Sequence, residues 1–406
     1  TGEYIETVEE RQPQQARSIF LTLDREFQYQ VEQALATALL THPTGQRGAV
    51  VVLDVNSGAI LAMASYPDYH PNIFDFSRPD AGAELNAVLN NPNNPLLNRA
   101  AQGAYPPGSV FKIMTMASGL ESGLYTPDTA YFCTGEWTGL GEALIKFDWL
   151  AGSHGSLTLR QALTRSCNPY FYEVGLHVGE QDPFLLPNIA RQFGLGVPTG
   201  IQGINETTGI MPDPEWKIAA IGEGWVIGDS VNMAIGQGFV EVSPLQVANM
   251  IATVANGGTL YQPYIIGRIG SGGGAPEENW PVTTIRQVTV NPQFMEVIRQ
   301  SMDDVTSGPS GTAAHRMIGL PVPTAGKTGT AETVGDSHAW FGGYAPAGPY
   351  TLANGTIIDT PQIAVAVIAE NSGEGSAVAA PIFRRIVELY YNITPLTPYP
   401  WESGSG

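Results

Sequence analysis

The sequence is poor in charged residues, and above all in basic ones. Charged residues occupy only 14% of the 406 positions, against a usual level of roughly 25%. The 38 acidic residues outnumber the 19 basic ones, which gives a net charge of -19. A surface of this charge repels phosphate backbones, so we expect no nucleic-acid partner.

Long apolar segments are also missing. No apolar run approaches the ~18 residues that a membrane span requires, and the chain starts at a threonine without a secretory signal. We therefore expect a fragment of a longer protein. In this interpretation residues 1–20 connect to a preceding domain, residues 21–395 form one domain and residues 396–406 form a flexible tail.

Glycine and proline are abundant, with 47 and 31 residues. This composition predicts many turns and long ordered loops. Low charge combined with many loops fits an extracytoplasmic protein. The length is sufficient for one large domain or two, with a sizeable core.

Strand patterns occur at both ends of the chain, and helical patterns lie mainly between them. A hairpin is predicted over 48–65, and further strands over 324–332, 338–347 and 361–370. Helices are predicted after Asp24 and over 109–120, 157–166, 169–178, 244–256, 291–304 and 378–391, whereas 66–105 and most of 190–216 read as loop. The fold class is therefore α+β, with an antiparallel sheet built from N- and C-terminal segments and a helical subdomain inserted within about 66–320.

Two short polar clusters lie in the helical part of the chain. Ser109 and Lys112 follow a Pro-Pro-Gly stretch, and their spacing places them on one face at the start of a helix. Ser166-Cys167-Asn168 separates two predicted helices. Each cluster alone has an ordinary interpretation, a solvated helix face for the first and helix capping for the second.

A third polar cluster, Lys327-Thr328-Gly329-Thr330, begins a predicted strand. A lysine and two hydroxyls on a strand edge could bind a carboxylate, although an ordinary edge strand guarded by a lysine has the same pattern. The three clusters together, S-x-x-K, S-x-N and K-T-G in this order, are the signature of serine acyltransferases that act on D-Ala-D-Ala peptides and β-lactams.

With these motifs the chain resembles the transpeptidase domain of class B penicillin-binding proteins. It is most similar to the elongation-type group, often called penicillin-binding protein 2. The resemblance covers nearly the whole chain, through segments such as "LTLDREFQYQVEQAL", "GDSVNMAIGQGFVEVSPLQVANMIATVANGG" and "HAWFGGYAP". It implies the fold shared with serine β-lactamases, with helices on both faces of the sheet. It also implies a membrane helix and a pedestal domain before residue 1.

The resemblance implies a peptidoglycan D,D-transpeptidase that works through a serine acyl-enzyme. Ser109 would be the nucleophile and Lys112, as a neutral amine, its base; partial burial and the cation Lys327 would lower the pKa of Lys112. Ser166 would relay the proton and Asn168 would hold the substrate amide. The terminal carboxylate would bind at Lys327, Thr328, Gly329 and Thr330, and the backbone N–H groups of Ser109 and Thr330 would form the oxyanion hole.

Two other functions carry the same motifs, namely a serine β-lactamase and a β-lactam-binding sensor. No deacylating glutamate can be identified, because Glu332, near the third motif, reads as a solvated side chain. The transpeptidase remains the leading hypothesis. It implies stem peptides ending in D-Ala-D-Ala as substrates, β-lactams as inhibitors, a glycan-polymerising partner, and a place on the outer face of the bacterial cell membrane.

The two cysteines, Cys133 and Cys167, allow two interpretations. An extracytoplasmic protein favours a disulfide between them. Asp148 and His154 lie between the cysteines in sequence, however, and the four residues together are ligand types of a closed zinc site. Some elongation-type relatives carry a similar arrangement with a carboxylate at the first position, so a structural zinc ion is expected over the disulfide. Catalysis itself requires no cofactor.

Overall fold

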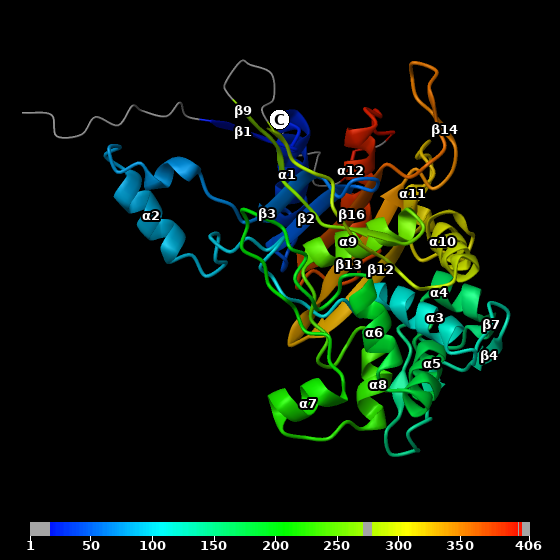
Figure 1. The fold of residues 1–406 in the computed structure, drawn as a ribbon. Helices are drawn as coiled ribbons and strands as arrows, with labels where there is room; N and C mark the ends of the chain where they lie inside the picture. Colours follow the sequence, from blue (N-terminus) through cyan, green and yellow to red (C-terminus); the bar gives the residue numbers. More distant parts are fainter. Residues whose placement is uncertain (1–16, 271–277, 397, 400–406) are drawn as a thin grey trace, which may run out of the picture.

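The computed structural model describes residues 17–270, 278–396 and 398–399, and its centre is a five-stranded antiparallel sheet (Figure 1). The strand order is β12-β13-β16-β2-β3, so the two ends of the chain meet in one sheet. The strands are β2 (Arg47–Asp54), β3 (Ile60–Tyr66), β12 (Ala325–Thr333), β13 (Gly335–Ala345) and β16 (Ile363–Glu370). All four sequence-predicted strand regions are confirmed, and so is the expected origin of the sheet.

The sheet is covered on both faces, which explains its nearly unbroken apolar strands. Every residue of β16 is buried, and alternate residues serve opposite faces. Val365 and Val367 pack toward α1 (Arg25–Leu40) and α12 (Ala379–Tyr390), where the rings of Phe341 and Phe383 lie 4.5 Å apart. Ala366 and Ile368 belong to the other core, which includes α9 (Pro244–Ala255).

Part of the inserted subdomain, from α5 to α8, lies below the sheet in Figure 1, whereas α10 and α11 lie beside it. Its helix α3 (Lys112–Glu121) is buried along nearly its whole length and contacts α5 and α10. The other helices are α4 (Leu159–Arg165), α5 (Asn168–Gln181), α6 (Leu185–Gln192), α7 (Pro214–Ile221), α8 (Ile227–Met233), α10 (Pro292–Ser307) and α11 (Ala314–Met317). The expected helical subdomain is therefore present, and the α+β class is confirmed.

Short strands supplement the main sheet. Two of them, β4 and β7, pair antiparallel beside the helical subdomain, and β1 pairs with β9. The short strands are β1 (Ser18–Leu21), β4 (Ala130–Cys133), β5 (Glu136–Trp137), β6 (Lys146–Phe147), β7 (Gly155–Thr158), β8 (Thr259–Tyr261), β9 (Ile266–Gly270), β10 (Glu278–Asn279), β11 (Thr284–Gln287), β14 (Tyr350–Thr351) and β15 (Ile357–Ile358).

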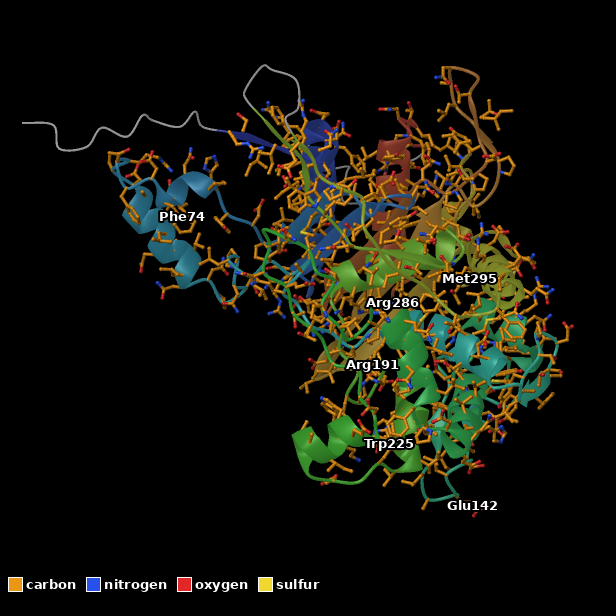
Figure 2. All side chains as sticks on the ribbon, in the orientation of Figure 1. Phe74, Glu142, Arg191, Trp225, Arg286 and Met295 are labelled. Atoms are coloured by element: carbon orange, nitrogen blue, oxygen red, sulfur yellow. The ribbon has the colours of Figure 1, made fainter. Side chains whose placement is uncertain are left out.

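The segment 66–105 differs from the predicted loop. It contains a 3₁₀ turn, η1 (Pro71–Phe74), and the helix α2 (Ala81–Leu89), which project away from the sheet; Phe74 marks this lobe in Figure 2. A proline before the helix and the stretch "NNPNNP" directly after it concealed a short run of good helix formers.

The helix α7 was also not predicted, although its start carries a recognisable signal. Asp213 accepts a hydrogen bond from the Trp216 N–H at 2.7 Å, and Pro214 occupies the first helical position. An aspartate followed by a proline is a typical helix start.

Residues 1–16 of the expected connector and nearly all of the expected tail lie outside the described residues. Of the connector, 17–20 are described, and they enter β1. Within the described ranges, none of the helices combines the length and the apolar character that crossing a membrane demands.

Candidate active site

A cavity of about 430 Å³ lies between the helical subdomain and the edge strand β12. Its lining includes residues from all three sequence motifs, namely Ser109, Ser166, Asn168, Thr328 and Thr330. These residues are scattered over more than half of the chain. The fold therefore brings the three motifs to one place, as the sequence predicted.

Ser109 lies in a tight turn that is packed against β12. It belongs to a 3₁₀ turn, η2 (Gly108–Phe111), which leads directly into α3. Gly108 has φ +53°, and a Cβ atom there would lie 2.6 Å from the Thr330 carbonyl oxygen. Only glycine fits both the backbone angle and this close approach, so Gly108 sets how near Ser109 lies to Thr330.

The two lysines of the motifs, Lys112 and Lys327, are completely buried behind the cavity lining. The Lys112 ammonium nitrogen donates to the Asn168 side-chain oxygen at 2.6 Å and to the Ser166 carbonyl at 2.8 Å. The Lys327 nitrogen donates to the Ser166 hydroxyl at 2.8 Å, which also lies 3.3 Å from the Lys112 nitrogen. Ser166 thus joins the two lysines. Within the described residues, no hydrogen bond joins the Ser109 hydroxyl to either of them.

The Ser166-Cys167-Asn168 motif forms the junction between α4 and α5. Ser166 ends α4 in the left-handed region, with φ +56°. Cys167 then caps α5, because its sulfur accepts a hydrogen bond from the Tyr170 N–H at 3.4 Å. The capping interpretation is therefore correct for the tripeptide, with the cysteine rather than the asparagine as N-cap, and it coexists with the lysine contacts.

Burial shifts the acid–base behaviour of both lysines. Burial lowers the pKa of Lys112 to about 8, although the charge of Asp148 opposes the shift. Burial and the neighbouring Lys112 cation also hold the pKa of Lys327 well below its ordinary value. The expected effect of burial on Lys112 is thus present. The expected effect of Lys327 on Lys112 is not, because the repulsion between the two lysines lowers the pKa of Lys327 instead.

The third motif lies on β12, with its hydroxyls toward the cavity and its glycine behind. The Thr328 hydroxyl is 2.7 Å from the hydroxyl of Thr312, and Thr330 accepts a 3.4 Å hydrogen bond from the Gly375 N–H. Gly329 lies behind the cavity wall, where a Cβ atom would come within 3.0 Å of the Pro107 carbonyl oxygen. Its position indicates a packing role beside the expected substrate contacts of its neighbours.

The cavity lining also includes residues that the sequence interpretation missed. Thr312 comes from the loop before α11, and nothing in its local sequence indicates a site. Tyr172 lies one helical turn after Asn168, so helical spacing could have predicted it. Glu332, interpreted as solvated, is exposed and also lines the cavity.

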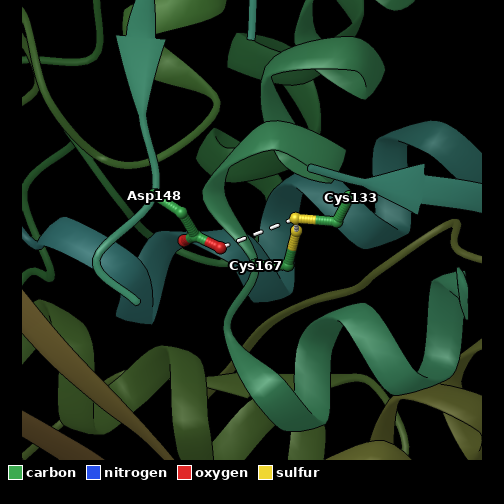
Figure 3. A group of neighbouring side chains, drawn as sticks. All are labelled: Cys133, Asp148 and Cys167. Carbon is green, nitrogen blue, oxygen red and sulfur yellow. Dashed lines mark hydrogen bonds between the residues drawn. The ribbon is translucent and has the colours of Figure 1, made fainter. Parts of the chain in front are cut away.

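Three of the four predicted metal ligands gather beside the second motif, and the fourth, His154, lies next to one of them without joining the group of mutually close donor atoms. Figure 3 shows Cys133, Asp148 and Cys167 pointing toward one another, with the two sulfur atoms 2.8 Å apart and the Cys133 sulfur 3.6 Å from an Asp148 oxygen. The His154 Nε2 atom lies 2.9 Å from the same Asp148 oxygen. The His154 side chain is buried, and its Nδ1 atom has no hydrogen-bond partner among the described residues. This donor set suits a tetrahedral zinc ion.

Asp148 connects this cluster to the second motif. Its other carboxylate oxygen accepts hydrogen bonds from the Asn168 N–H at 3.0 Å and the Trp149 N–H at 2.9 Å. Burial alone would raise the pKa of Asp148, but hydrogen bonds from His154 and Asn168 and the Lys112 cation outweigh burial and lower it. An ionised Asp148 can therefore hold both a metal and the start of α5.

The chain belongs to the penicillin binding protein transpeptidase domain family, whose model matches residues 48–388. It is 33% identical over 408 residues to the peptidoglycan D,D-transpeptidase MrdA of Haemophilus influenzae, covering 96% of this chain and 59% of the relative. The chain thus spans about six-tenths of the length of that curated relative. The predicted family membership is confirmed.

Solved structures confirm the fold and the likeness to penicillin-binding protein 2. PBP2 of Pseudomonas aeruginosa, in complex with WCK 5153, is 31% identical with a TM-score of 0.78, over 92% of this chain and 76% of that one. A penicillin-binding protein A acyl-enzyme from Mycobacterium tuberculosis is 29% identical with a TM-score of 0.75, over 91% and 79%. A peptidoglycan synthase complex, described as coordinating polymerization and crosslinking, is 34% identical with a TM-score of 0.76, over 94% and 64%.

Gly108→Ala tests whether the close approach of the Ser109 turn to β12 controls the site. A methyl group would clash with the Thr330 carbonyl, so we expect acylation by a fluorescent penicillin to slow about a hundredfold. Gly123→Ala is the matched control, because Gly123 has φ +73° but open space around it and bears only the backbone cost of about 1–2 kcal/mol. Equal acylation rates in the two variants would contradict the prediction.

Proposed function

We propose that this chain is the catalytic domain of a peptidoglycan D,D-transpeptidase that forms an acyl-enzyme at Ser109. The observation that carries the proposal is the hydrogen-bonded assembly of Lys112, Ser166, Asn168 and Lys327 at the base of the cavity that Ser109 lines. Membership of the transpeptidase domain family supports it. Its substrates are stem peptides that end in D-Ala-D-Ala.

The lysine pair activates the serine. A serine hydroxyl becomes a competent nucleophile when a nearby base takes its proton, and a pKa of about 8 gives Lys112 a substantial neutral fraction near neutral pH. In the substrate-free cavity the Lys112 nitrogen points to Ser166 and Asn168. Catalytic hydrogen bonds often tighten only when substrate binds, and we propose that the contact with the Ser109 hydroxyl forms in this way.

The remaining motif residues hold the substrate and move the proton. Ser109 attacks the penultimate D-Ala carbonyl, and the backbone N–H groups of Ser109 and Thr330 stabilise the developing oxyanion. Thr328 and Thr330 receive the terminal carboxylate through their hydroxyls. Lys327, whose nitrogen donates to the Thr328 carbonyl and the Ser166 hydroxyl, adds an electrostatic attraction when it carries a proton. Ser166, which contacts both lysines, passes the proton to the departing D-Ala amine.

The acyl-enzyme is resolved by the amine of a second stem peptide, which completes the cross-link. A β-lactam resembles the donor peptide and stalls at the acyl-enzyme, and the acyl-enzyme of the tuberculosis relative supports this step. A serine β-lactamase would instead release the adduct quickly to water. A non-catalytic β-lactam sensor would keep the adduct but form no cross-link.

We further propose that Cys133, Asp148, His154 and Cys167 hold a structural zinc ion rather than a disulfide. A disulfide would account for the two thiols but not for the buried histidine and the ionised carboxylate beside them. A bound zinc ion would cross-link the end of β4 to the second motif. Through the contact of Asp148 with the Asn168 N–H, the site would hold Asn168 in place.

The partner and the location are proposals about the intact protein. The synthase complex that coordinates polymerization and crosslinking supports a glycan-polymerising partner. A peptidoglycan substrate supports action outside the cytoplasmic membrane. An N-terminal membrane helix and a pedestal domain remain predictions.

Incubation with a fluorescent penicillin, followed by intact-mass measurement over hours, tests the proposed function. We expect a long-lived adduct at Ser109 that is lost in Ser109→Ala, and cross-linked dimers when stem peptides are supplied. Rapid release of the adduct would favour the β-lactamase, and a stable adduct without cross-linking would favour the sensor. Absence of any adduct on folded protein would refute the acyl-enzyme.

The acylation rate is expected to depend on pH through Lys112. The base acts only as a neutral amine, so raising the pH through its pKa of about 8 increases the rate toward a plateau. Lys112→Arg should abolish acylation, because a guanidinium keeps its proton. Stopped-flow acylation of the folded protein measures both effects, and a flat profile across pH 8 would show that another group is the base.

Metal analysis of the purified protein tests the zinc proposal. We expect one zinc ion per chain, lost in Asp148→Asn together with thermal stability, because the ligands would be left buried and unpaired. Asp128→Asn is the control, since Asp128 is exposed and lies outside the cluster. Metal-free protein in which a thiol titration finds no free sulfhydryl would show the disulfide instead.

A further inference from the structure

A buried ionic cluster lies away from the catalytic cavity, centred on the carboxylate of Glu370. Glu370 is the last residue of β16, and one of its oxygens accepts hydrogen bonds from the Arg99 Nε and the Tyr105 hydroxyl, each at 2.8 Å. The other oxygen lies 2.9 Å from the Arg47 Nε. Among the described residues, the cavity lining includes none of these four side chains.

Burying these charges costs free energy, and the charged groups of the cluster all have partners. Arg99 is 2% exposed, and its remaining nitrogens donate to the carbonyls of Asn93 and Asn94. Removing one partner from such a group leaves a buried charge unpaired. Burial and the Glu370 carboxylate raise the pKa of Tyr105, so its hydroxyl keeps its proton and donates. The arginines thus hold Glu370 in place, and Glu370 in turn holds Tyr105.

Tyr105 lies four residues before Ser109, and the chain between them is fixed at successive points. The Tyr105 backbone exchanges two hydrogen bonds with Val242. The Pro106 carbonyl accepts from the Trp340 indole at 3.0 Å, and the Gly108 N–H donates to the Gly236 carbonyl at 3.0 Å. Two prolines restrict φ in this segment. With so little freedom in this segment, a displaced Tyr105 would move Ser109 as well.

Glu370 also lies next to the row of paired strand residues that contains Thr330, whose N–H is a proposed oxyanion donor. Across the sheet, Thr330 of β12 pairs with Ala339 of β13, which pairs with Ala369 of β16. Glu370 is the residue immediately after Ala369. The carboxylate thus ties the segment that carries Ser109 to the strand row that carries Thr330.

We propose that Glu370 is a positioning residue, which sets the distance between Ser109 and the Thr330 N–H through its hydrogen bond with the Tyr105 hydroxyl. The proposal rests on the acyl-enzyme function proposed above. The alternative is a structural role only, in which the cluster attaches the loop before Arg99 to the sheet. The two roles differ in their effect on catalysis, because misalignment of a nucleophile slows the chemical step more than it weakens binding.

Tyr105→Phe removes the hydroxyl and keeps the ring, and Tyr125→Phe is its matched control. Both tyrosines are 7% exposed, and both make one side-chain hydrogen bond of 2.8 Å, to Glu370 and to His177 respectively. With a fluorescent penicillin, we expect Tyr105→Phe to lower the acylation rate constant about tenfold or more. The dissociation constant of the initial non-covalent complex should stay within about twofold, and Tyr125→Phe should leave the rate constant unchanged.

Glu370→Gln completes a double-mutant cycle with Tyr105→Phe. If one hydrogen bond carries the effect, the losses in acylation rate are non-additive. Equal rate constants for Tyr105→Phe and Tyr125→Phe, with equal losses of thermal stability, would overturn the proposal in favour of the structural role. That comparison decides the question even if Glu370→Gln does not fold. Wild-type protein without an adduct would refute the acyl-enzyme itself, whereas normal wild-type acylation with an unchanged Tyr105→Phe would refute only the positioning role.

Discussion

Two lysine side chains that share one serine hydroxyl in the protein interior are the constraint on which the site depends. Lys112 and Lys327 are both completely buried, and both approach the Ser166 hydroxyl. Burying two cations together is unfavourable, so at least one amine is driven toward its neutral form. Burial lowers these pKa values, and a lowered pKa supplies the neutral amine that can take a proton from a serine nucleophile.

Such a pair must be held from outside, because the lysines repel each other. The scaffold does this with elements that meet at the cavity edge, namely α3 for Lys112, the α4–α5 junction for Ser166 and β12 for Lys327. Each element is fixed by its own packing, since α3 is buried along its length and β12 lies in the central sheet. The proposed zinc site and the Glu370 cluster extend this support to the second motif and to the Ser109 turn.

The sequence predicted what depends on local pattern or on ordered motifs. Local sequence patterns were sufficient to predict the hairpin of β2 and β3 and the apolar strand β16. The order of the three motifs was sufficient to identify the site. The helix α2 was missed because an Asn- and Pro-rich stretch follows it, and Thr312 because its position depends on a tertiary contact with Thr328. Glu370 carried no signal either, since only strand register brings it beside Tyr105. Contacts between residues that are far apart in the sequence cannot be predicted from local sequence patterns.

The distribution of charge also suits the proposed chemistry. The chain has a net charge of -19, yet the base of the cavity holds two lysines and the Glu370 cluster holds two arginines against one carboxylate. The positive charge nearest the cavity is therefore that of the buried lysine that keeps its proton, in surroundings of low dielectric that strengthen its effect on a bound anion. In the proposed reaction this charge draws the substrate carboxylate toward Thr328 and Thr330, because the rest of the lining includes the acidic residues Asp148, Glu332 and Glu374.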